Sequence, residues 1–130
     1  MFLKALNPEE KANFLSLVYL IAKIDGEYSE AEKEIIENYK LEMGLEYIRK
    51  GKTILELINY FASKEMPLKK LVLFKVYGLI ISDNQLNKNE SEVLSLMEEK
   101  FALSQDTYKA ISAVVEELKS VYDRIYDVLA

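Results

Sequence analysis

The sequence predicts an all-α fold, a compact bundle of about six or seven helices, from two observations. No segment keeps the alternation of apolar and polar residues typical of a strand, whereas helix start and stop signals recur at short intervals. In addition, residues 15–45 align without a gap on residues 73–103, 58 positions further on, and seven of the 31 aligned positions are identical. We therefore expect residues 1–130 to form one domain built from a duplicated helix–turn–helix unit.

The first unit is expected to contain two helices, each with a recognisable beginning and end. Asn7 is a suitable N-cap, and the helix that begins after it with a proline should run to about Ile24, before an Asp-Gly pair. Residues 29–32, Ser-Glu-Ala-Glu, form a capping box for the second helix, which Gly44 should end. A short helix is also expected over residues 46–50.

The second half of the chain should repeat this arrangement after one intervening helix. A capping box opens a helix over residues 53–64, and a proline opens a longer helix over residues 67–81. Residues 82–87 form the second turn, and Asn87 caps the helix that follows it. A last helix is expected to begin at about Gln105.

This last helix carries an apolar residue every three or four positions, which is typical of a long buried seam. One interpretation is that it packs over both repeated units. The alternative is that it binds a partner helix or forms a homodimer, which the additional apolar residues Val114, Val121 and Val128 favour. The seam consists of Tyr108, Ile111, Val115, Leu118, Tyr122, Ile125 and Leu129.

The composition excludes several kinds of functional site. The chain contains no cysteine and no histidine, which rules out thiolate chemistry and the commonest general base near neutral pH. Its four glycines do not form a phosphate-binding loop. Any metal would therefore be a hard cation on oxygen ligands, such as Ca²⁺ or Mg²⁺. No segment has the length of a membrane span and no signal peptide is recognisable, so a cytoplasmic protein is expected.

The net charge of −5 argues against nucleic-acid binding, because a polyanion repels a negatively charged protein. Residues 1–45 carry five lysines and nine acidic residues, whereas residues 46–70 carry six basic and three acidic residues. The basic connector, Arg49-Lys50-Gly51-Lys52 with Lys69-Lys70, is most simply a solvated face. The alternative is a contact with an anionic partner or with the acidic face of a second copy.

Five acidic residues in the two turns are the candidate site: Asp25, Glu27, Glu32, Asp83 and Glu90. In the structural interpretation, the two aspartates bond to their own turns and the later glutamates cap helices, each cap being worth about 1 kcal/mol. In the functional interpretation, the two turns converge and their carboxylates hold a divalent cation. A paired-carboxylate hydrolase is a third interpretation, for which the sequence supplies no substrate pocket.

The segment AKIDGEYSEAE (residues 22–32) resembles the TerB-like tellurite-resistance family. The resemblance implies a compact, duplicated helical domain that is cytoplasmic and non-catalytic, is linked to tellurite and other stress resistance, contacts other proteins and is suspected of binding a metal through its turn acids. By position, these acids are Asp25 and Glu32, with Asp83 and Glu90 in the second copy.

The second turn departs from this pattern, because it lacks the glycine and the acid that follows it, so a cation site shared by both turns is expected to be weaker here. The alternative to a TerB-like interaction domain is a structural or oligomerisation module whose acids only cap helices.

Overall fold

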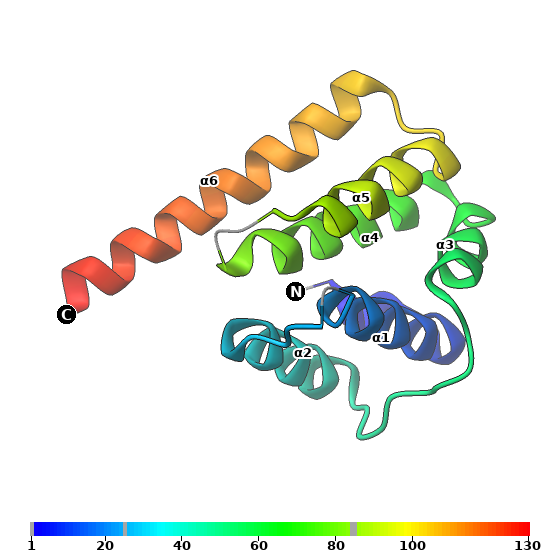
Figure 1. Ribbon diagram of the computed structural model, residues 1–130, viewed down its shortest axis with the longest axis horizontal. Helices are drawn as coiled ribbons and strands as arrows, with labels where there is room; N and C mark the ends of the chain where they lie inside the picture. The colour runs from blue at the N-terminus through cyan, green and yellow to red at the C-terminus, as the bar shows by residue number, and fades with distance from the viewer. Residues whose placement is uncertain (1, 25, 84–85) are drawn as a thin grey trace.

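The computed structural model describes residues 2–24, 26–83 and 86–130, apart from the side chain of residue 83. Within these ranges the chain forms six α-helices, two short 3-10 helices and no strand, which confirms the all-α prediction (Figure 1). The elements in chain order are η1 (Leu3–Ala5), α1 (Pro8–Ala22), α2 (Glu30–Met43), α3 (Ile54–Ala62), α4 (Met66–Ile80), η2 (Ile81–Asp83), α5 (Lys88–Lys100) and α6 (Gln105–Leu129).

The helix bounds follow the 58-residue offset of the sequence repeat. Helices α1 and α4 have 15 residues each, and both their first and last residues correspond across the two copies. Helices α2 and α5 also begin at corresponding residues. Helix α2 of the first unit contacts η2 of the second unit.

Four helices begin with a capping box, as the sequence predicts. In each, the N-cap side chain accepts a hydrogen bond from the third helical amide, and a glutamate at that position accepts one from the N-cap amide. The four pairs are Asn7 with Glu10, Ser29 with Glu32, Thr53 with Glu56 and Asn87 with Glu90.

The core forms around α1, which contacts α2, α3 and α4. The middle of α1 is apolar on nearly all sides, and its large side chains are buried, which confirms the central position expected from the sequence. Helix α4 buries its own apolar side chains against the same core. The buried apolar residues of these two helices are Ala12, Phe14, Leu15, Leu17, Val18, Ile21, Ala22, Val72, Leu73, Val76, Leu79 and Ile80.

The helix predicted over residues 46–50 is absent, and this prediction was wrong. The segment instead lies across α1, where the Ser16 hydroxyl donates a hydrogen bond of 2.9 Å to the Arg49 carbonyl. Lys52 reaches the same helix, with its Nζ 3.1 Å from Asn13 Oδ1. These bonds hold the connector along α1, so tertiary contacts outweigh the local helix preference of residues 46–50.

The seam predicted on the last helix is buried only in its first half. Val115 is 5% exposed and lies against α4, whereas Tyr122 is 53%, Ile125 44% and Leu129 79% exposed, so the prediction was wrong for the second half. The physical reason is length, because α6 has 25 residues and α4, its main contact, has 15. No helix in the described ranges has the length and apolarity of a membrane span.

Candidate functional site

The first acidic turn is organised around a buried capping glutamate. Glu32 is only 4% exposed, and its Oε1 accepts a hydrogen bond of 3.0 Å from the Ser29 amide. Its own amide donates to Ser29 Oγ at 3.1 Å. Tyr28 lies beside this cap with its ring edge-on to Tyr19, and burial raises the pKa of its phenol. The carboxylate therefore has a structural role as a cap.

The second turn repeats this geometry. Glu90 is 3% exposed, with its Oε1 3.3 Å from the Asn87 amide and its own amide 2.8 Å from Asn87 Oδ1. Glu10 and Glu56 make the same capping bonds, yet Glu10 is only partly buried and Glu56 is exposed. Burial of the two repeat glutamates therefore comes from their place in the bundle, since the local motif is the same in all four cases.

The remaining acids of the candidate site are only partly placed. Glu27 lies in the first turn with an exposed side chain, while Asp25 and the side chain of Asp83 lie outside the described residues. Among the acids that the structure does describe, no three come together as potential metal ligands. The structure thus places the two capping glutamates and Glu27, and it leaves the predicted five-residue cluster open.

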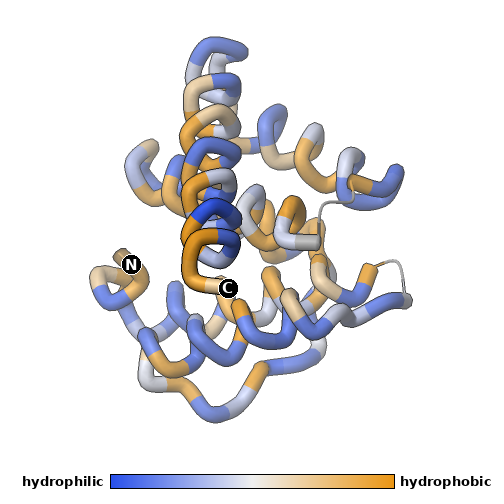
Figure 2. Tube along the Cα trace, turned by 90° about the vertical axis from the view of Figure 1, so that its left-hand side faces the viewer, coloured by the Kyte–Doolittle hydropathy of each residue, from blue (hydrophilic) through white to orange (hydrophobic). Residues whose placement is uncertain are grey.

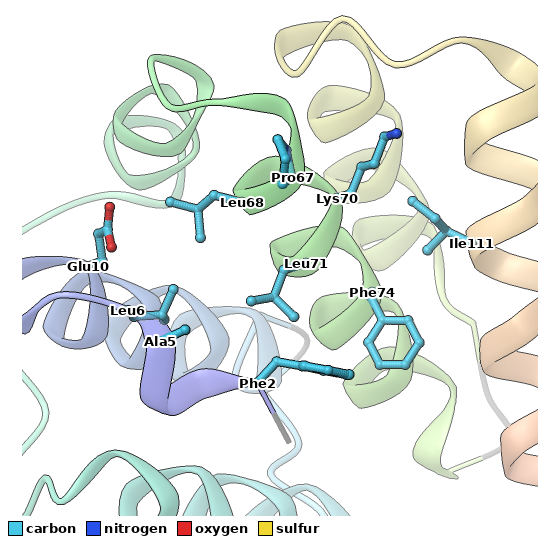
Figure 3. Close-up of a pocket in the computed structure, with 10 residues that line it drawn as sticks. All are labelled: Phe2, Ala5, Leu6, Glu10, Pro67, Leu68, Lys70, Leu71, Phe74 and Ile111. Carbon is cyan, nitrogen blue, oxygen red and sulfur yellow. The ribbon is translucent and has the colours of Figure 1, made fainter.

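An apolar groove of about 590 Å³ lies between η1, α4 and α6 (Figure 3). Phe2 and Phe74 point toward one another at one end, and Ile111 faces α4 from α6. Two charged side chains, Glu10 and Lys70, lie at its edge. The remaining lining residues are Ala5, Leu6, Pro67, Leu68 and Leu71.

The sequence interpretation missed this groove. Residues 2–6 show no helical period of their own. The structure holds this segment by the Leu3 amide, which donates a 2.7 Å hydrogen bond to Glu42 Oε2 of α2. The one available signal was the apolar Leu6 immediately before the N-cap of α1, a position that is typically packed against the start of a helix.

The second half of α6 is an apolar surface that continues beyond the groove. Every residue from 120 onward is exposed, and in Figure 2 hydrophobic segments continue along α6 to its C-terminal end. Val121 is 40% exposed and Val128 83% exposed. The first half is fixed on α4 by the Tyr77 hydroxyl, which donates a 2.7 Å hydrogen bond to Glu116, and by the contact between the Tyr77 and Tyr108 rings.

The basic connector is mostly exposed, as a solvated face requires. Arg49 and Lys50 present their side chains to solvent, and Lys69 and Lys70 lie on α4, where Lys70 borders the groove. Lys52 also lies over the Tyr60 ring, at 5.9 Å from its centroid.

No family model, curated protein or solved structure matches this chain. The resemblance of residues 22–32 to the TerB-like family therefore stays a prediction from those residues.

Proposed function

We propose that this chain is a non-enzymatic, cytoplasmic interaction domain of the TerB-like, stress-resistance type, which binds another protein through the groove and the exposed face of α6. The observation that carries the proposal is the unpartnered apolar surface itself. Six apolar or aromatic side chains on the second half of α6 are between 40% and 83% exposed. Apolar patches of this kind on otherwise polar domains mark sites of protein contact.

A comparison of the two repeated units supports the proposal. Four of the five groove residues of α4 are apolar, whereas their counterparts on α1 are polar or charged, and two of these counterparts are bonded to the connector; the exception is Lys70, which corresponds to Ala12. The same helix face is thus closed by hydrogen bonds in one unit and left open and apolar in the other. The pairs are Glu9 with Pro67, Glu10 with Leu68, Asn13 with Leu71 and Ser16 with Phe74.

The divalent-cation site remains part of this proposal as a tuning element. Its support is the burial of two carboxylates, Glu32 and Glu90, at equivalent turns, since carboxylates removed from water favour a nearby cation. The alternative, in which these acids only cap helices, is supported by the hydrogen bonds that both make. Ca²⁺ and Mg²⁺ are the cations of suitable chemistry.

The interaction proposal can be tested by capture from an extract of the source cells. The immobilised full chain should retain a specific protein that the variant Val121→Glu/Ile125→Glu fails to retain. The matched control is Ala113→Glu/Ser120→Glu, which adds the same charge at two exposed positions of α6 off the apolar face. Equal retention by all three chains would contradict the proposal.

A further inference from the structure

Apolar residues of α6 that are exposed or only partly buried form a heptad pattern suited to pairing with a second helix. Their spacing alternates between three and four residues, which is the spacing of a two-helix seam. The members are Ile111, Val114, Leu118, Val121, Ile125 and Val128. Val115, which faces α4, lies on one flank of this stripe, and Glu117 and Arg124 lie on the other.

We propose that this stripe binds a second copy of the chain, with the two α6 helices packed antiparallel, an inference that rests on the proposed function. Antiparallel alignment about the midpoint between Leu118 and Val121 brings the stripe into register with itself. It pairs Ile111 with Val128 of the other copy, Val114 with Ile125 and Leu118 with Val121, and the twofold axis repeats each pair. Every stripe residue then has an apolar partner.

The flanking charges select the antiparallel orientation. In an antiparallel pair, the same flank of the stripe in each copy lies against its equivalent in the other copy. Glu117 of each copy then faces Arg124 of the other, and two opposite-charge contacts form across the axis. In a parallel pair unlike flanks meet, so the same two residues face Tyr122 and Leu129 instead. Arg124 borders the same shallow hollow as Val121 and Ile125, which places it beside the stripe.

The groove extends this contact onto the body of the domain. Ile111 belongs to both the stripe and the groove lining, so the partner's last turn, with Val128 and Leu129, arrives at the mouth of the groove. Residues 111–128 span about 26 Å of helix. Weak, transient interfaces bury less than about 1,200 Å² in total, which is the size class expected for a contact of this length.

Single charge-reversal variants of the full chain test this arrangement. Their dimer dissociation constants are measured by sedimentation equilibrium from micromolar to near-millimolar concentration. Glu117→Arg creates two like-charge contacts per dimer, and so does Arg124→Glu. Each single variant should weaken dimerisation about tenfold. An equimolar mixture of the two variants should associate as the unmodified chain does, because each Arg then faces a Glu. Lys109→Glu, an exposed reversal off the stripe, is the matched control and should leave dimerisation unchanged.

Three results would overturn the inference. An unmodified chain that stays monomeric throughout excludes the dimer, while stripe-dependent capture from extract still decides the interaction-domain proposal. A dimer that both reversals leave intact uses another surface. A dimer that the reversals weaken but the mixture does not restore lacks the antiparallel charge pairing. Since Glu117 and Arg124 are exposed, loss of fold does not complicate these results, and circular dichroism verifies this.

Discussion

Replacing Ala102 by glycine should stabilise the domain, and replacing Gly44 by alanine should destabilise it. These residues correspond across the repeat and follow α5 and α2, respectively, with positive φ angles of 54° and 72°. Both helix ends make the same closing bonds, from the Leu45 amide to the Lys40 carbonyl at 2.9 Å and from the Leu103 amide to the Glu98 carbonyl at 3.1 Å. The second copy therefore holds an alanine in a conformation that favours glycine.

The magnitude follows from conformation alone. A Cβ added at Gly44 meets nothing within 4 Å, and Ala102 is exposed, so neither change creates a clash or a cavity. A left-handed conformation costs an alanine roughly 1–2 kcal/mol. About 0.4–1 kcal/mol of this cost is offset, because an unfolded chain with alanine at the position is less flexible than one with glycine. Each single change should thus shift the free energy of unfolding by about 1 kcal/mol, in opposite directions.

Urea unfolding followed by circular dichroism at a fixed protein concentration measures these effects. With a slope of about 2 kcal/mol/M, each substitution should move the midpoint by about 0.5 M, and the melting temperature by about 3 °C. The double variant Gly44→Ala/Ala102→Gly should unfold close to the unmodified chain, because the two opposite effects should add when the substitutions act independently. If Ala102→Gly lowers the midpoint, the argument that both copies end a helix through a left-handed residue is wrong.

Three further predictions concern the turns, the core and the pH dependence. If the turns bind a cation, millimolar Ca²⁺ or Mg²⁺ should raise the melting temperature of the unmodified chain by several degrees but not that of Glu32→Gln. If neither metal changes the melting temperature of the unmodified chain, helix capping is the remaining role of these acids. Val115→Ala should cost about 2 kcal/mol in urea unfolding, because it removes buried methyl groups between α6 and α4. Burial raises the pKa of Tyr39, whose hydroxyl donates to the Lys75 carbonyl at 3.3 Å. The phenol ionises at a lower pH in the unfolded chain than in the folded one, so the free energy of unfolding is unaffected below about pH 10 and falls as the pH rises further. In urea unfolding measured above pH 10, Tyr39→Phe should therefore lose less of its neutral-pH stability than the unmodified chain does.

Much of the fold could be predicted because local chemistry marks where these helices begin and end. The capping boxes at Asn7, Ser29, Thr53 and Asn87 all open helices at the expected residues. Gly44 ends α2 in a left-handed conformation, as glycine at that position predicts. Such signals depend on a few neighbouring residues and on backbone hydrogen bonds, so they can be read without tertiary structure.

The errors arose where tertiary contacts decide the outcome. Residues 46–50 have no helix because α1 offers them hydrogen bonds through Ser16, which no local pattern indicates. The apolar period of α6 predicted that its side chains would be covered but could not reveal that α4 ends before α6 does. The groove was missed for the same reason, since it joins residues of η1, α4 and α6 that are distant in the sequence.

The duplication separates features that both copies keep from features that only one copy has. Glu32 and Glu90 occupy equivalent places, are buried to the same extent and make equivalent capping bonds, as expected of residues that each copy needs for folding. The apolar groove face occurs only on α4, and its counterpart on α1 is bonded to the connector. Folding of the first copy does not require an apolar surface at this position, and the second copy leaves one open beside the exposed half of α6. This surface is therefore a more informative place to look for function than the capping glutamates.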